Sequence, residues 1–288
     1  MMQVLRQVLA IGIVMSVAVL NAAQAAAAVA MVTDLQGKAV QSIEGRTREL
    51  SVLSDLDAGA QVQIQSGATL TVLYLESGSE FLFKGPAAVI FAAAQPEVTS
   101  GAKAEKRAPA LGRGGRDIRI KPVGLVQGAM VMRNLRAGAR LLLVTPRGGY
   151  TLDPSPEFRW QAVPGGLTYA FELNDESGVA VHQAQTAALS VMLPATVLLR
   201  EGMQYSWEVS TRTADGARVS NIGKFSLAPA DLRTQADAAR PDAAAPLASR
   251  VVYAAWLEQM NLKDEARKYW QAAAAERPDE PRLKTFAE

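Results

Sequence analysis

Alternating hydrophobic and polar residues predict a series of short β-strands in the first third of the chain. Residues 60–65 alternate strictly between apolar and glutamine side chains, which is the period of a strand with one buried face. The runs at 68–75, 81–83 and 87–91 are apolar, with β-branched or aromatic residues typical of strands, and glycine, serine or proline separates them. Such turn residues recur about every 8–12 positions. Residues 29–98 are therefore expected to form an all-β domain.

A second group of short apolar runs predicts a β-sandwich over residues 142–228. About seven short strands are expected there, which is the number typical of a sandwich domain of this size. Asp215 and Gly216 form a hairpin signal ahead of the last of them. Residues 153–160 lead into the first core strand, further strands are expected at 168–173, 179–182, 189–193 and 203–209, and the chain continues through Val219 to a closing strand at 224–227.

The periodicity changes from two to that of a helix near the C-terminus. Residues 229–246 are rich in alanine, proline and aspartate, a composition that predicts a linker. Small and apolar side chains then recur at helical spacing over 247–288, with a turn at 261–263 and a stop at Arg277-Pro278. The chain is thus predicted to be mainly β, with a short C-terminal α-hairpin.

The N-terminus has the three parts of a secretory signal peptide in the right order. Arg6 is followed by an apolar run over 8–20 and by the small-x-small pattern Ala23-Gln24-Ala25. The run is short for a membrane helix, which needs about 20 apolar residues. We expect residues 1–25 to be a cleaved signal peptide and the chain to be periplasmic. The alternative is an inner-membrane anchor in which residues 8–32 are retained.

Residues 29–98 resemble a FecR-like periplasmic domain, with return strands that extend to about residue 141. The resemblance implies a periplasmic β-domain that contacts other proteins or surfaces. In that family, the archetype passes an outer-membrane signal to a cytoplasmic sigma factor and has a cytoplasmic helical domain, whereas only about seven residues precede the apolar segment here. The resemblance rests on Gly37, Asp57-Ala58-Gly59, Ser66-Gly67-Ala68, residues 70–73 and Ser77-Gly78-Ser79 ahead of Phe81.

Residues 142–228 resemble a fibronectin type III or immunoglobulin-like domain of bacterial envelope proteins. Tyr205 matches a tyrosine corner, whose hydroxyl bonds the backbone upstream, and Trp160 and Trp207 are expected to face each other in the core. Residues 247–280 resemble one tetratricopeptide-like hairpin, through Ala254, Ala266, Trp270, Ala273 and Pro278. Because stable arrays of such hairpins need about three repeats, a single hairpin is expected to dock on its own chain, a second copy or a partner.

Composition limits the chemistry that the chain could carry. It has no cysteine, one histidine (His182) and a net charge of +2 from 30 basic and 28 acidic residues. A nucleic-acid partner is not expected, because such proteins usually carry a clear basic excess. The lone histidine gives no metal-ligand or nucleophile motif. We therefore predict no catalytic, cofactor-binding or metal-binding residue, and no enzyme activity.

Two sets of residues are candidates for contact with other molecules. Residues 99–122 form a basic, glycine-rich segment read as a loop or linker, in which Arg113, Arg116 and Arg119 could touch an anionic surface such as cell-wall polymer. In the C-terminal hairpin, Tyr253, Leu257 and Trp270 are predicted to contact a partner helix.

These expectations together describe a non-enzymatic periplasmic protein for interaction or assembly, in which other envelope proteins are the partners. A role in an envelope sensory pathway fits the FecR resemblance. The alternatives are a membrane-anchored signal-transducing regulator and a cell-wall glycan-binding module. A membrane contact is expected only if the N-terminal segment is retained.

Overall fold

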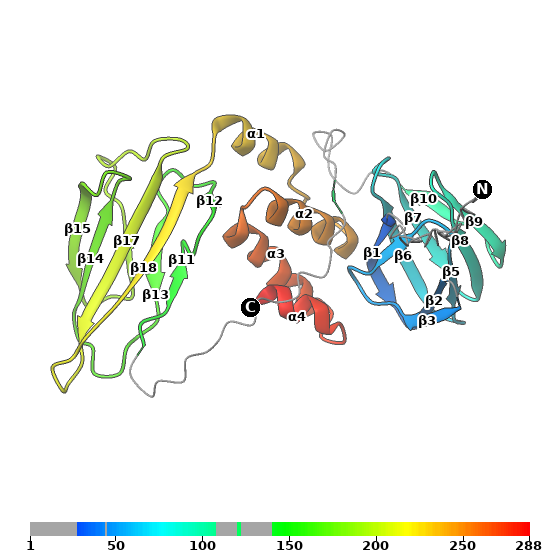
Figure 1. The fold of residues 1–288 in the computed structure, drawn as a ribbon, viewed down its shortest axis with the longest axis horizontal. Helices are drawn as coiled ribbons and strands as arrows, with labels where there is room; N and C mark the ends of the chain where they lie inside the picture. The colour runs from blue at the N-terminus through cyan, green and yellow to red at the C-terminus, as the bar shows by residue number, and fades with distance from the viewer. Residues whose placement is uncertain (1–27, 44, 108–119, 122–139) are drawn as a thin grey trace, which may run out of the picture.

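The protein consists of two β-sandwiches with a layer of helices between them (Figure 1). A computed structural model describes residues 28–43, 45–107, 120–121 and 140–288. The predicted signal peptide, at 1–25, lies outside these ranges. Most of the regular structure is β, and the helices fall at the C-terminal end, so the predicted fold class is confirmed.

The first sandwich packs two five-stranded antiparallel sheets face to face around one apolar core. The predicted alternation at 60–65 appears as β5, in which Gln61 and Gln63 are exposed. One sheet has the order β10 (Glu105–Arg107), β7 (Glu80–Lys84), β6 (Thr69–Tyr74), β1 (Ala28–Gln36), β4 (Asp55–Asp57). The other has the order β3 (Arg46–Glu49), β2 (Ala39–Ile43), β5 (Ala60–Ile64), β8 (Ala87–Phe91), β9 (Pro96–Ser100).

Two sequence-based boundaries of this domain are corrected by the structure. Residues 99–122 were expected to be a loop, but β9 reaches Ser100 and β10 pairs antiparallel with β7. The charges of β10 are compatible with a strand because it lies at the edge of its sheet, where side chains reach solvent. Residues 28–32 belong to β1, so the alternative membrane anchor over 8–32 cannot extend through Val32.

The second sandwich contains eight strands in two sheets, close to the seven expected. The short pair of residues 150–151, β12, joins the larger sheet parallel to β18. The smaller sheet has the order β11 (Leu143–Thr145), β13 (Glu157–Trp160), β16 (Ser190–Met192). The larger has the order β12 (Tyr150–Thr151), β18 (Arg218–Leu227), β17 (Gln204–Arg212), β14 (Tyr169–Asn174), β15 (Ala180–Thr186).

Aromatic side chains fill the core of the second sandwich, as the sequence predicted. Trp160 and Trp207 are both buried, but they do not stack on each other. The ring of Phe171 lies 6.4 Å from Trp160 and 6.1 Å from Trp207 and so connects them. The Tyr205 hydroxyl accepts a hydrogen bond from the backbone N–H of Arg200, at 2.8 Å, so the predicted tyrosine corner is present.

Four helices form a layer, which we call the helical layer: α1 (Ala230–Ala239), α2 (Leu247–Gln259), α3 (Lys263–Glu276) and α4 (Pro281–Ala287). The prediction of a linker over 229–246 is wrong, because most of this segment is α1. Alanine has the highest helix propensity, and Pro229 precedes the helix, where it costs no hydrogen bond. Ala236 and Ala239 are buried, and the carbonyl of Ala236 accepts a hydrogen bond from the Tyr253 hydroxyl.

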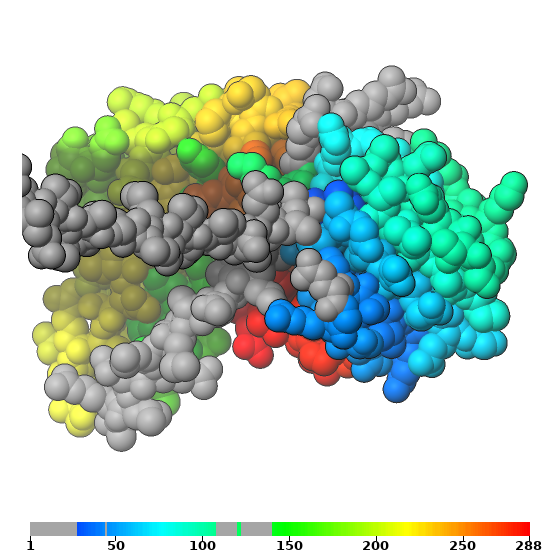
Figure 2. Space-filling model, turned by 45° about the vertical axis from the view of Figure 1, so that its right-hand side comes forward, coloured from blue at the N-terminus to red at the C-terminus, as the bar shows by residue number. Residues whose placement is uncertain are grey.

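The predicted hairpin of α2 and α3 docks on its own chain, one of the three alternatives. Met31 of β1 and Leu73 of β6 share a core with the buried side chains of α2. The middle of the β1 sheet is therefore covered on both faces, by the second sheet on one side and by α2 on the other. Figure 2 shows the red C-terminal helices beside the blue strands of the first sandwich.

A charged network reinforces this contact. The Arg277 side chain, 11% exposed, binds the Asp34 carboxylate and the carbonyl oxygen of Leu35. Glu280 accepts a hydrogen bond from the backbone N–H of Val52, and Arg282 donates one to the carbonyl oxygen of Leu53 at 2.9 Å. The residues following α3 thus fix the helical layer to the first sandwich.

The turn between α2 and α3 fixes the helical layer to the second sandwich. Asn261 has a φ of +59°, the left-handed conformation that often ends a helix, and its carbonyl oxygen accepts a hydrogen bond from Tyr150 at 2.8 Å. A Cβ atom on Gly149 would lie 2.1 Å from that oxygen. The close approach therefore requires glycine at position 149.

Buried acids near the first contact predict an unusual dependence of stability on pH. Burial, followed by repulsion from Asp57, raises the pKa of Asp55 to about 6 from an ordinary value of 3.8, against the opposing effects of Arg48 and Arg282. Burial also raises the pKa values of Asp34 and Glu280. Because the folded state binds these protons more tightly than the unfolded state, stability should increase as the pH falls through about 6 towards about 4.

We expect the protein to melt a few degrees higher at pH 5 than at pH 7.5, and Asp55→Asn to raise the melting temperature at pH 7.5. Two pKa units correspond to about 3 kcal/mol, and partial exposure of Asp55 reduces this to roughly 1 kcal/mol. Thermal unfolding at both pH values measures the effect, with Glu49→Gln on the exposed strand β3 as the control for loss of one charge. A melting temperature that falls on acidification to pH 5 would contradict the prediction.

Candidate functional site

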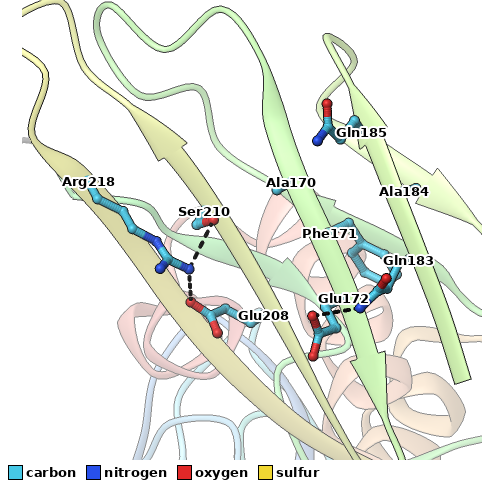
Figure 3. Close-up of a pocket in the computed structure, with 9 residues that line it drawn as sticks. All are labelled: Ala170, Phe171, Glu172, Gln183, Ala184, Gln185, Glu208, Ser210 and Arg218. Atoms are coloured by element: carbon cyan, nitrogen blue, oxygen red, sulfur yellow. Dashed lines mark hydrogen bonds and ion pairs between the residues drawn. The ribbon is translucent and has the colours of Figure 1, made fainter. Parts of the chain in front are cut away.

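The outer face of the larger sheet of the second sandwich carries a polar hollow of about 410 Å³ (Figure 3). A second hollow continues it along β14 and β17 and shares Ala170, Gln185, Ser210 and Arg218 with the first. We call the combined feature the sheet-face furrow. Its outward side chains are Ala170, Glu172, Gln183, Gln185, Glu208, Ser210, Arg212 and Arg218.

The furrow follows from the alternation of side chains along the strands. On β14 and β17 the aromatic residues point into the core, and the residues between them point outward. The small residues Ala170 and Ser210 are opposite each other in register and form the floor. Longer side chains on β15 and β18 form the two sides, as Figure 3 shows for Gln183, Gln185 and Arg218.

Two carboxylates lie directly opposite each other at one end of the furrow. Glu172 and Glu208 are cross-strand partners, an arrangement that is unfavourable for like charges on a sheet. The Glu172 carboxylate accepts hydrogen bonds from the side-chain amides of Asn174, at 2.9 Å, and Gln183, at 3.0 Å. Arg218 donates to Glu208 at 3.2 Å. Neighbouring donors therefore hold both carboxylates in place.

The furrow offers fixed hydrogen-bonding groups instead of an apolar pocket. Carboxylate, amide, hydroxyl and guanidinium groups all face solvent there, and most of these are planar groups that can make two parallel hydrogen bonds. Arg212 and Arg218 balance the charges of Glu172 and Glu208. The arrangement suits a polar ligand or a polar protein surface.

Another hollow lies where the second sandwich meets the helical layer, but its charged residues are paired with one another. Arg240 binds Asp237 at 2.7 Å, and Lys268 binds Glu265 at 2.7 Å. Arg233 binds Glu201 across the junction. Only the Arg233–Glu201 pair joins the helical layer to the second sandwich, and the other two pairs lie within the helical layer. Because these charges are already paired, this hollow is a weaker candidate than the furrow.

The structure corrects the predicted partner-helix contact of Tyr253, Leu257 and Trp270. Their exposed fractions are 1%, 0% and 0%, so none is available to a partner in this conformation. The Tyr253 ring lies 4.9 Å from that of Tyr269, and the Trp270 ring lies 5.1 Å from that of Phe286. Because α1, α4 and the first sandwich cover the hairpin, these side chains stabilise the chain's own interior.

The other predicted features have different outcomes. Arg113, Arg116 and Arg119 lie outside the described residues. His182 lies on the edge strand β15, with its ring 6.2 Å from that of Phe171. Among the residues that the structure describes, no group of three histidine, cysteine, aspartate or glutamate residues is placed to hold a metal ion. No helix in the described ranges is long and apolar enough to cross a membrane.

Sequence reasoning missed the furrow, although it identified the strands that form it. The alternation at 168–173 placed Ala170 and Glu172 on the outer face. The missing signal was the cross-strand register, which sets Ala170 opposite Ser210 and Glu172 opposite Glu208. Register depends on how separate segments pair and is not encoded in the period of any single strand.

Comparison with known proteins identifies no family. No protein-family model matches the chain, and no curated protein matches it. CopC from Methylosinus trichosporium OB3b is 17% identical over 32% of this chain and 96% of its own, with a TM-score of 0.23. A tetra-tandem repeat from the extending region of a large adhesion protein is 12% identical over 70% of this chain and 42% of its own, with a TM-score of 0.25. Likenesses this low carry no argument, and the fold described above stands on the structure alone.

Proposed function

We propose that this chain is an exported, non-enzymatic binding protein of the bacterial envelope and that the sheet-face furrow is its recognition surface. Other envelope proteins are the proposed partners, and the periplasm is the proposed compartment. The resemblance of the first sandwich to FecR-like domains supports a place in an envelope sensory or assembly pathway. The signal-like pattern around Arg6 and Ala23-Gln24-Ala25 supports export.

The furrow carries this proposal. Its two opposed carboxylates would repel each other, and each is held by donors from neighbouring side chains. Contact with donors of a partner would relieve the remaining repulsion, because each carboxylate can accept several further hydrogen bonds. The helical layer contributes by fixing the two sandwiches to each other, so that the furrow is presented on a rigid support.

Site-specific photo-crosslinking in living cells tests the proposal. A photoreactive residue at Gln185, on one side of the furrow, is expected to capture another envelope protein, whereas one at Gln204, exposed on the same sheet, is not. Ala170→Tyr, which fills the floor, should reduce capture at least about tenfold if it costs about 1.4 kcal/mol of binding. Ser206→Tyr, beyond the end of the furrow, is the matched control.

The furrow is refuted as the recognition surface if photoreactive residues at Gln185 and Gln204 capture the partner equally. It is also refuted if the Ala170→Tyr variant with a photoreactive residue at Gln185 captures the partner as fully as the unsubstituted chain. The mass of the purified protein also shows at which residue the mature chain begins. A chain that begins after Ala25 supports export with cleavage, and a chain that retains Arg6 favours the membrane-anchored alternative.

A cell-wall glycan is the second candidate ligand, because the furrow carries paired amide, carboxylate and guanidinium groups that suit sugar hydroxyls. Co-sedimentation with purified cell-wall sacculi separates this from protein binding. Sedimentation of the protein with sacculi, and its loss in the Ala170→Tyr variant, would support the glycan over a protein partner.

A further inference from the structure

The outer edge of β15 is open in a way that the other sheet edges are not. Within the described ranges, β15 pairs with β14 on one side and with no strand on the other. An open edge presents unpaired backbone N–H and C=O groups to any other extended chain. Proteins therefore usually protect such edges with charge, proline or short length.

Seven other strands form the remaining sheet edges, and each is protected. In the first sandwich β3, β4 and β10 carry charges at most of their positions, and β9 contains Pro96 and Glu97. In the second sandwich β11, β12 and β16 are only two or three residues long. β15 is the longest of the edge strands, with seven residues, and carries no proline, lysine, arginine, aspartate or glutamate; its one protecting feature is a bulge at Val181, and residues 182–186 form a regular open edge.

We infer that β15 pairs antiparallel with β15 of a second copy of this chain, extending the larger sheet across a two-fold axis. This inference rests on the proposed function, because Gln183 and Gln185 of β15 also form one side of the furrow. A two-fold axis places the same patch on both copies, so the patch must be complementary to itself.

The composition of β15 meets that requirement. An axis centred on Gln183 sets this residue opposite Gln183 of the other copy, within the stretch 182–186 that pairs regularly with β14; the register shift at Val181 interrupts the ladder at the start of the strand. The glutamine side chains brought together are uncharged, so no like charges become opposed. Glutamine amides both donate and accept, and they form ladders between identical strands. A charged edge such as β4, in which Asp55 would face Asp57 of the other copy, would repel its own copy in the same arrangement.

The pairing is expected to be reversible. Pairing of one β15 strand from each copy buries less surface than the roughly 1,200 Å² typical of a stable interface. Analytical ultracentrifugation of the purified protein should therefore show a monomer at about 1 µM and a growing dimer fraction towards about 200 µM, which corresponds to a Kd on the order of 100 µM. A monomer throughout this range would overturn the inference.

Cysteine crosslinking tests the register directly, because the chain contains no cysteine of its own. Gln183→Cys should form a disulfide-linked dimer under mild oxidation, since directly opposed residues have Cβ atoms about 4.5–5.5 Å apart. Gln185→Cys, two positions from the axis, should crosslink poorly alone.

Gln204→Cys on β17 measures the background from random collisions. Crosslinking at Gln183 no greater than this background, or equal crosslinking at Gln183 and Gln185, would overturn the strand pairing. If the protein is monomeric but a photoreactive residue at Gln185 still captures another envelope protein, the proposed function stands and the second copy is excluded as the occupant.

Discussion

Trp207→Ala should destabilise the second sandwich by about 3–5 kcal/mol, the range for removal of a buried tryptophan. The indole of Trp207 is fully buried, lies 5.2 Å from the ring of Phe158 and donates a hydrogen bond to the carbonyl oxygen of Pro146 at 3.0 Å. Alanine would leave both a cavity and an unpaired buried carbonyl. We expect the melting temperature of this domain to fall by roughly 12–40 °C.

Leu167→Ala is the control for this prediction. Leu167 belongs to the same domain but is 82% exposed, so its truncation should change the free energy of unfolding by less than about 0.5 kcal/mol. Near-UV circular dichroism and thermal unfolding measure both variants. If Trp207→Ala were as stable as Leu167→Ala, Trp207 could not be a core residue of the folded domain.

Arg277→Gln should loosen the contact between the helical layer and the first sandwich at a cost of about 3–5 kcal/mol at neutral pH. The variant leaves Asp34 and Glu280 partly buried without their guanidinium partner. Burial already raises the pKa values of both carboxyls. The loss should therefore be smaller at pH 5, where more of each carboxyl is protonated and needs no counter-charge.

Arg240→Gln provides the matched control for the interface. Asp237 of α1 and Arg240, the residue that caps the C-terminal end of this helix, form an exposed ion pair. Such pairs contribute only about 0–1 kcal/mol to the free energy of unfolding. Calorimetry should show separate unfolding transitions for the first sandwich and the helical layer in the Arg277→Gln variant, and a single transition in the Arg240→Gln variant. Limited proteolysis should likewise cut between these two parts only in the Arg277→Gln variant. A single transition at an unchanged temperature in Arg277→Gln would mean that the apolar contact at Met31 and Leu73 suffices.

The sequence predicted the elements whose pattern is complete within one segment. Strict alternation at 60–65 and 168–173 corresponds to β5 and β14, and the helical spacing after residue 247 corresponds to α2 and α3. The prediction failed where composition was ambiguous. An alanine-rich stretch between prolines fits both a linker and a helix, and the buried contact of Ala236 with Tyr253 favours the helix.

The sequence by itself determined that the chain is mainly β, that aromatic residues form the core of the second sandwich and that a helical hairpin ends the chain. These follow from residue type and period, which act over a few neighbouring positions. Only the tertiary structure decided that Tyr253, Leu257 and Trp270 are covered, that Glu172 faces Glu208 and that β15 is left at an open edge. Each of these depends on which distant segment packs alongside, and that choice is made by the free energy of the whole fold.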